Sequence, residues 1–466
     1  MPSAKFQAIE YGLLASLTAG LALDHTQIMQ HTQHDVAIAV TSIATVTLLA
    51  LHRWRRELFT AYVAIGVYAY LHAVEWRSWS ATAAVGWKVT SFKLSALGVL
   101  VAWMMALLFP LPDFTSLTGP YKTIGCHTGR YGGVECRVFY PSSRDAPTVP
   151  PTKRIRYLHH GVHLAKGLSV FSRLPHWMFN NLSNAFLSSI DEAPIATPPT
   201  ATGWPVIIFS HGLAGSLELY SINNEQMASH GHIVVVINHC DGSASVARPE
   251  DERVEYYQRV TKEVLNNVDG AGFRFRNSQL RHRVQEVRRV LNAVEKEHKQ
   301  HAPGSIFAQM DMDRVNVSGH SFGAATAMTA AHIDNRFKHA ILLDGWMFPV
   351  TDEVKQGVGS RIPVVHIISE HFANWKENMD DMKKHMYGCT HPQSALLVLE
   401  GSRHNNFSDL PLFSPIVNRL VLASGKIDPR YALEATASLS AAFLRGDMAS
   451  LLSSFPEMKP VVDLTI

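Results

Sequence analysis

The chain has 466 residues, of which 47% are hydrophobic and 17% are charged, whereas about 25% of the residues of an average soluble domain are charged. Apolar residues are plentiful and the 29 Gly and 23 Pro are ordinary numbers, which excludes a disordered chain and a collagen-like repeat. The formal net charge of +3 is too small and too scattered for a nucleic-acid-binding protein. Four cysteines without a CxxC pair exclude a disulfide scaffold and a zinc ribbon.

The first 112 residues differ in composition from the rest, because they hold only 12 of the 81 charged residues of the chain. A helix needs about 17–25 apolar residues to cross a bilayer. Residues 1–112 are therefore predicted to form a transmembrane region of about four helices, and the chain a multi-pass integral membrane protein. The apolar runs that carry this prediction are Tyr11–Leu23, Val36–Leu51, Leu58–Val74 and Leu94–Leu111.

Two alternatives remain for this region. The first run, which follows Lys5, also fits a signal peptide, and all four runs also fit a buried helical bundle of a soluble protein. The arginine cluster at 53–56 favours a cytoplasmic loop between the second and third spans, which would place both termini and the rest of the chain in the cytoplasm. Arg77, Lys88 and Lys93 argue for the opposite orientation.

Residues 113–466 show short β-branched runs that alternate with longer helical stretches, a pattern typical of a parallel α/β sheet. Each run is almost continuously apolar, as expected where helices cover both faces of the sheet. We therefore predict an α/β fold with a doubly wound, mostly parallel sheet. The expected strands are Val206–Ser210, Ile233–Ile237, Val315–Ser318, Ala340–Leu343, Val364–Ile368 and Leu396–Leu399.

One motif carries chemistry. Gly319-His320-Ser321-Phe322-Gly323 lies between an expected strand and an alanine-rich expected helix, which is the setting of the GxSxG nucleophile elbow of the α/β-hydrolase fold. The sharp turn exposes the serine hydroxyl, and glycines flank it because a Cβ would meet the neighbouring strand and helix. Ser321 is the predicted nucleophile.

A nucleophilic serine needs a base, and the base needs an orienting acid. In this fold the acid and then the histidine follow the serine along the chain, each after a strand. Asp344 ends one expected strand and Glu370 follows the next, so either fits the acid. His404 follows the last expected strand and is the preferred base. The other candidate histidines are His371, His385 and His391.

The loop after Val206–Ser210 is the candidate oxyanion hole. His211-Gly212-Leu213 is similar to the glycine-bearing oxyanion loops of lipases and esterases. The backbone N–H groups of Leu213 and Phe322 are the expected donors. We interpret His211 as a packing residue of this loop.

These residues resemble the platelet-activating factor acetylhydrolases of the plasma and intracellular type-II kind. The resemblance covers most of residues 119–450 and implies Ser321, Asp344 and His404 as the triad, with Leu213 and Phe322 as oxyanion donors, in preference to Glu370. Its motifs are Gly119-Pro120-Tyr121, Phe209-Ser210-His211-Gly212-Leu213, Asp241-Gly242-Ser243-Ala244-Ser245, the elbow, Leu343-Asp344-Gly345-Trp346-Met347-Phe348-Pro349, His404-Asn405-Asn406-Phe407-Ser408-Asp409 and Gly425-Lys426-Ile427-Asp428.

The chain departs from this family in three places. Cys240 stands where the relatives carry Arg, Gly345 stands where Ala is usual, and the N-terminal region lies outside the resemblance. Residues 158–190 are apolar and aromatic. In the family this region looks like an interfacial helix on lipid surfaces, which makes Trp177, Met178 and Phe179 membrane-interface candidates. A cap helix packed on the sheet is the alternative.

The expected function is that of a membrane-anchored, calcium-independent serine esterase that removes short or oxidised sn-2 acyl groups from phospholipids. A transacylase or a generic lipid carboxylesterase with the same triad is the alternative. The expected partners are the phospholipid substrate and the bilayer, with no nucleic acid, and no protein partner is inferred. No cofactor and no metal are expected: the histidines at 25–34 and His159, His160 and His163 are interpreted as loop residues.

Overall fold

The structure is a computed structural model that describes residues 8, 10–19, 59–64, 66, 81–110, 112, 114, 117–143, 154–176, 179, 182, 185–251, 253–301, 304–357 and 361–462. The chain divides into two compact units. One comprises residues 1–113 and 180–185, and the other comprises residues 114–179 and 186–466.

The smaller unit contains helices that pack on one another. Residues 10–19 and 59–64 are helical, and α4 spans Ala81–Leu108. The ring of Tyr11 stacks on Trp103 with centroids 5.6 Å apart, and the Trp103 indole donates to Thr18 Oγ1 at 3.1 Å. Small side chains let the helices approach closely. The buried core of this unit consists of Leu13, Leu14, Leu17, Ala61, Ala64, Val99, Ala102 and Ala106.

This unit corrects the predicted transmembrane region. Among the described residues, no helix is both long enough and apolar enough to cross a membrane. The apolar residues of the first run instead recur at helical spacing and pack against alanines of neighbouring helices, a role that hydropathy alone does not distinguish from a span. The multi-pass membrane localisation is wrong for the same reason. The run Val36–Leu51 lies outside the described residues.

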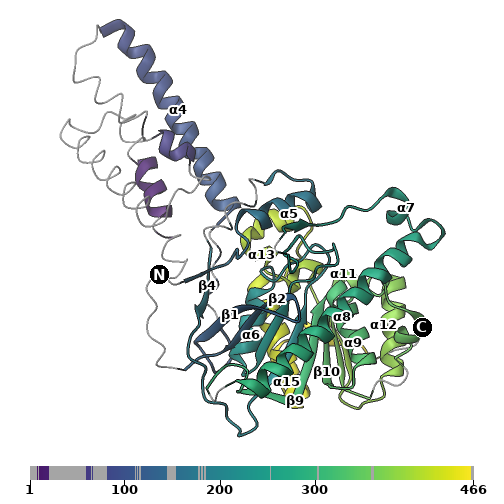
Figure 1. Cartoon of the computed structure of the whole chain (residues 1–466). Coiled ribbons are helices and arrows are strands. Elements are labelled where there is room, and N and C mark those ends of the chain that lie inside the picture. The colour runs from purple at the N-terminus through teal and green to yellow at the C-terminus, as the bar shows by residue number, and fades with distance from the viewer. Residues whose placement is uncertain are drawn as a thin grey trace. The chain divides into compact units, whose positions relative to one another are not determined.

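The larger unit is built on a mixed sheet of 11 strands (Figure 1). Six neighbouring strands, from β12 (Ala395–Leu399) to β6 (Ile233–Ile237), are parallel, and they include every strand expected from the sequence. The strands that flank these six pair antiparallel with their neighbours, except for one parallel pair between residues 125–126 and 190–191. In sheet order the strands are β13 (Met458–Pro460), β12 (Ala395–Leu399), β11 (Val364–Ser369), β10 (Phe337–Leu343), β9 (Met310–His320), β5 (Trp204–Ser210), β6 (Ile233–Ile237), β2 (Val134–Pro141), β1 (Ile124–Tyr131), β4 (Phe186–Asp191) and β3 (Arg154–Arg156).

The central strands are apolar because helices cover both faces. All five residues of β6 are buried, for example. The long α8 (Ala271–Gln300) shows the matching helical pattern: its buried residues include Leu280, Val284, Val287 and Leu291, spaced three or four apart. The principal helices are α5 (Val162–Ser172), α6 (Ser221–Ser229), α8 (Ala271–Gln300), α9 (Phe322–Ile333), α12 (Lys376–Gly388) and α15 (Pro429–Arg445), and the short ones are α7 (Lys262–Leu265), α10 (Asp352–Lys355), α11 (Glu370–Ala373), α13 (Leu410–Phe413), α14 (Pro415–Leu420) and α16 (Met448–Leu451).

The strand order reverses between β5 and β9, and this reversal marks the expected ligand-binding position at the carboxyl ends of these strands. From β5 the chain moves through α6 to β6 on one side, and later strands continue from β9 on the other side. Right-handed crossovers in opposite directions put α6 on one face and α8 and α9 on the other; consistently, α6 packs with α15 and α8 packs with α9. Ligands of doubly wound sheets bind at the carboxyl ends of the strands where this reversal occurs.

Candidate active site

The elbow between β9 and α9 holds Ser321 in a backbone conformation that side chains rarely adopt, with φ 58° and ψ −116°. The flanking glycines make this turn possible. A Cβ on Gly319 would lie 2.2 Å from the Gly323 carbonyl oxygen, and a Cβ on Gly323 would lie 2.0 Å from that of Ser210. The strained residue is thus fixed by backbone packing on both sides.

Three predicted residues from different strand ends meet here. Asp344 follows β10, and His404 begins a short 3-10 helix beyond β12. His404 Nε2 lies 2.9 Å from Ser321 Oγ, and His404 Nδ1 lies 2.6 Å from Asp344 Oδ2. The structure therefore brings Ser321, His404 and Asp344 into one hydrogen-bonded line.

The carboxylate of Asp344 is fully buried and well satisfied. Ser369 donates to it twice, from its backbone N–H at 2.7 Å and from its hydroxyl at 2.9 Å. The His404 ring stacks on Phe372 with centroids 4.4 Å apart, while its side chain remains 31% exposed. The charge on Asp344 is thus held by fixed donors, and the imidazole is open on one side to a reacting group.

The competing candidates have other contacts. Glu370 accepts from the Gly401 backbone N–H at 2.6 Å and so supports the loop that leads to His404. His385 is buried against His366, with their ring nitrogens 3.1 Å apart, whereas His371 and His391 are not buried.

The candidate oxyanion loop, residues 211–215, is held in place by a side chain of α8. Arg283 is fully buried, donates to the His211 carbonyl at 2.6 Å, and holds Asp241 Oδ2 at 3.0 Å. Its guanidinium also lies over the Phe322 ring at 4.4 Å. A single arginine therefore contacts both segments that supply the expected oxyanion donors. Sequence reasoning missed it, because an arginine in an amphipathic helix carries no motif.

A second connection runs through Tyr220. The Gly212 N–H donates to the Tyr220 hydroxyl at 3.1 Å, and that hydroxyl lies 2.9 Å from His320 Nδ1. The other nitrogen of His320 lies 3.0 Å from the His404 carbonyl oxygen. Burial lowers the pKa of His320 well below its ordinary value, so a neutral ring accepts from Tyr220 and donates to His404. Sequence reasoning missed Tyr220 as well.

His211 and Cys240 have no acid–base role in this geometry. Burial, followed by the charge of Arg283, lowers the pKa of His211 to about 3, so the ring is neutral and packs in the loop. Burial raises the pKa of the Cys240 thiol to about 12, which keeps it protonated. The Cys240 backbone N–H donates to Glu286 at 3.1 Å.

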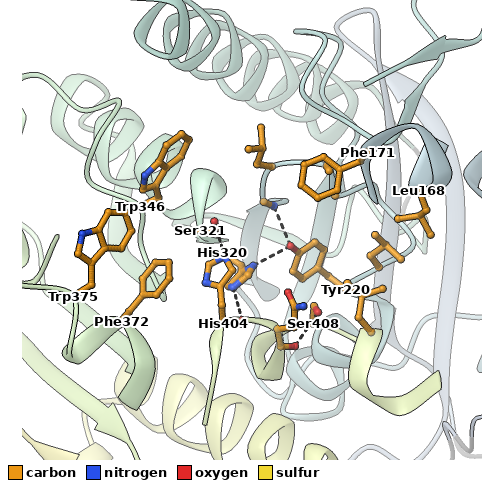
Figure 2. A pocket seen from close by; sticks show the side chains of 17 residues that line it. Leu168, Phe171, Tyr220, His320, Ser321, Trp346, Phe372, Trp375, His404 and Ser408 are labelled. Atoms are coloured by element: carbon orange, nitrogen blue, oxygen red, sulfur yellow. Dashed lines mark hydrogen bonds between the residues drawn. The ribbon is translucent and has the colours of Figure 1, made fainter. Parts of the chain in front are cut away.

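An apolar pocket of about 320 Å³ opens onto Ser321 and His404. Figure 2 shows Trp346, Phe372 and Trp375 on one side of these residues and Leu168 and Phe171 on the other. The latter two come from α5, within the segment 158–190. Of the proposed membrane-interface residues, Phe179 is half-buried, and Trp177 and Met178 lie outside the described residues.

Comparisons with known proteins agree with this architecture. Residues 111–463 match the family described as platelet-activating factor acetylhydrolase, isoform II. The platelet-activating factor acetylhydrolase of Bos taurus is 31% identical over 67% of this chain and 71% of its own length, and that of Canis lupus familiaris is 28% identical over 80% and 85%. A putative phospholipase A2 of Schizosaccharomyces pombe is 27% identical over 70% and 85%.

Among solved structures, a ferulic acid esterase from Streptomyces cinnamoneus superposes with a TM-score of 0.56 at 20% identity, over 75% of this chain and 98% of that one. At this level of identity the match shows a shared fold alone.

Proposed function

The chain belongs to the platelet-activating factor acetylhydrolase isoform II family and is a carboxylic ester hydrolase; from this membership we propose that Ser321, His404 and Asp344 are its catalytic triad. The observation that carries the proposal is the line of hydrogen bonds from Asp344 through His404 to the Ser321 hydroxyl, at the base of an apolar pocket. Nucleophile, base and orienting acid are recognised by such geometry rather than by sequence position.

In the acylation step, Ser321 Oγ attacks the ester carbonyl carbon while His404 Nε2 accepts the hydroxyl proton. Asp344 keeps the Nδ1 proton in place and stabilises the imidazolium. The backbone N–H groups of Leu213 and Phe322 donate to the oxyanion. The intermediate then expels the alcohol, which takes the proton from His404.

Deacylation repeats these roles with water as the nucleophile. His404 accepts a proton from water, the second oxyanion occupies the same hole, and the carboxylic acid leaves as Ser321 regains its proton. Backbone N–H groups stabilise the oxyanion and His404 holds the transferred proton in both steps. The proposed mechanism therefore does not use a calcium ion.

The proposed substrate is a phospholipid with a short or oxidised sn-2 acyl chain. The family supports the phospholipid class, and the apolar walls suit an acyl group. Withdrawing an acyl chain from a lipid surface costs about 0.8 kcal/mol for each buried CH₂, so short chains reach Ser321 at a lower cost. We further propose that residues 113–466 form the catalytic domain and that α5 acts as a cap, because Leu168 and Phe171 line the pocket.

The test compares wild type with Ser321→Ala on phosphatidylcholines of increasing sn-2 chain length. Wild type should act fastest on the shortest chains, and adding Ca²⁺ to chelator-treated enzyme should leave its rate unchanged. Ser321→Ala, with an unchanged circular dichroism spectrum, should lose at least about 10³-fold in kcat/KM. Substantial activity in folded Ser321→Ala would exclude Ser321 as the nucleophile, and rates that rise with chain length would exclude the short-chain preference.

The same assay separates hydrolysis from transacylation. With a lysolipid or alcohol acceptor present, a hydrolase releases free carboxylic acid, whereas a transacylase forms a new ester through the same acyl-serine. Mass spectrometry of the products measures the ratio, and predominance of the new ester would reassign the reaction.

A further inference from the structure

Away from the pocket, a histidine pair lies against two carboxylates in the larger unit. His159 and His160 form the turn between β3 and α5, Glu135 lies on β2, and Glu218 lies in the loop before α6. None of the four residues belongs to the triad or lines the pocket. They come from three separate parts of the chain, so no local sequence motif predicts the cluster.

Three of these side chains direct ligand atoms at one another. His160 Nε2 lies 2.9 Å from Glu135 Oε2, and His159 Nε2 lies 3.4 Å from Glu135 Oε1. The ligand atoms of the three residues all lie within 4.8 Å of one another. Adjacent ligands of tetrahedral zinc, with bonds of 2.0–2.1 Å, stand about 3.3 Å apart. The separation of 3.4 Å between His159 and Glu135 matches this spacing, whereas the separation of 2.9 Å between His160 and Glu135 is that of a hydrogen bond and would have to widen slightly around an ion.

The surroundings match what a metal-binding histidine requires. His160 Nδ1 lies 2.7 Å from Glu218 Oε1, which directs the opposite nitrogen at Glu135. A carboxylate on the far side of a ligating histidine fixes the tautomer and the ring orientation. Asn238 donates to Glu135 Oε2 at 3.2 Å, so the ligating carboxylate is also held.

Burial and access both suit a divalent cation. The side chains of His160 and Glu218 are 0% exposed and that of Glu135 is 10% exposed, whereas His159 is 36% exposed. His160 lies between two carboxylates that are removed from water, and such carboxylates need a positive charge beside them, which either a protonated His160 or a bound cation supplies. Among the described residues, Glu218 Oε2 is buried with no hydrogen-bond partner. The partly exposed side chain of His159 places one side of the cluster at the solvent.

We propose that Glu135, His159 and His160 form a binding site for a zinc-type divalent cation, with Glu218 orienting His160. The site has three protein ligands and one open position. It ties β2 to the turn that begins α5, the helix that supplies Leu168 and Phe171 to the pocket. The ion therefore stabilises the cap rather than taking part in ester hydrolysis.

The experiment titrates Zn²⁺ into the full-length, tag-free protein after chelator treatment and desalting. Isothermal titration calorimetry gives the stoichiometry, and visible absorption of Co²⁺ bound in place of zinc reports the coordination. Wild type should bind one ion per chain and show a higher Tm with zinc. His159→Ala, which changes a half-exposed side chain, should weaken binding at least tenfold, and Glu218→Gln should weaken it about 10–100-fold.

The matched control is His301→Ala, because His301 is 41% exposed and also faces a carboxylate, with its Nδ1 3.1 Å from Glu297. The zinc affinity of His301→Ala should equal that of wild type. His320, Asp344 and His404 form another cluster of ligand atoms, so His404→Ala is included. Zinc binding that persists in His159→Ala but is lost in His404→Ala would overturn the proposal. Failure of wild type to bind zinc stoichiometrically would also overturn it, and would leave His160 as a proton-bearing bridge between two carboxylates.

Discussion

At the scale of single residues, the contacts of His404 distinguish between Asp344 and Glu370, the two candidates that the sequence offers for the orienting acid. Asp344 is buried and 2.6 Å from His404 Nδ1, whereas Glu370 is exposed and accepts from a backbone N–H. Burial of a carboxylate is costly without partners, and Ser369 and His404 are those partners. The two acids should therefore differ sharply in their effect on the rate.

We expect Asp344→Asn to lower kcat on the order of 10³-fold or more, because the amide favours the wrong tautomer of His404. Glu370→Gln is the matched control and should change kcat by less than about threefold, since its amide oxygen can still accept from Gly401. Steady-state kinetics on a short-chain ester measure both. A larger loss in Glu370→Gln would transfer the orienting role to that residue.

Tyr220 connects Gly212 of the proposed oxyanion loop to His320, which in turn contacts His404, and we expect it to act as a positioning residue. Tyr220→Phe leaves the Gly212 N–H without its acceptor and His320 without its donor, and one unsatisfied buried group costs about 1–3 kcal/mol. We expect kcat to fall on the order of tenfold with little change in KM, because the loss affects the transition state. Tyr387→Phe, at an exposed position, controls for the loss of a hydroxyl. An unchanged kcat in Tyr220→Phe would remove this role.

At the scale of elements, the segment after His404 is attached to the start of α6 through Asp409. The Tyr157 hydroxyl donates to its Oδ2 at 3.0 Å and the Ile222 N–H to its Oδ1 at 3.2 Å. Burial raises the pKa of Asp409 to about 8 despite these donors. The unfolded chain therefore loses this proton near pH 4 while the folded chain keeps it until about pH 8.

A raised carboxyl pKa gives stability that is complete below the unfolded value and is lost as pH rises through the folded value. Between pH 4 and 8, Asp409 should therefore lower the free energy of unfolding by at most about 1.4 kcal/mol per pH unit. In Asp409→Asn this contribution is absent, so the Tm of wild type should fall relative to the Tm of the variant between pH 5 and pH 8. Calorimetry at several pH values measures the two Tm values, and a wild-type Tm that stays constant or rises relative to that of the variant would contradict the raised pKa.

At the scale of the whole molecule, the proposed triad, the pocket and the sheet all come from the larger unit, and the family match begins at residue 111. We expect a chain that begins at Phe114 to fold and to hydrolyse a soluble short-chain ester with kcat/KM within about threefold of the full chain. Circular dichroism and steady-state kinetics test this. A truncated chain that folds but loses most of its activity would assign a catalytic contribution to the removed residues.

The sequence alone predicted the central strands of the sheet and three residues of the candidate site. The six parallel strands were predicted because burial on both faces leaves continuous apolar runs such as 233–237. The strands β1 to β4 and β13 were not predicted. β1 and β2 interrupt their apolar residues with polar or charged ones, β3 has only three residues, and β4 and β13 pair with segments far away in the chain. Ser321, Asp344 and His404 were named because each follows a strand in a fixed order.

The other residues discussed above have no recognisable motif in the sequence. Arg283, Tyr220 and Glu135 acquire their roles only when helices, loops and strands far apart in the chain meet. The transmembrane prediction was wrong for a related reason, since an apolar run records which residues avoid water but not what covers them.

The close backbone contacts around Gly319 and Gly323 limit which substitutions this enzyme can accept at the elbow. Because even a methyl group at 319 or 323 would overlap a backbone oxygen, a mutational library should recover almost no active clone with these two glycines replaced. Leu168 and Phe171, which line the pocket from α5, lie outside the strained turn. Engineering toward new esters should therefore diversify these two positions and leave the elbow untouched. The two regions would then evolve at different rates within one active site.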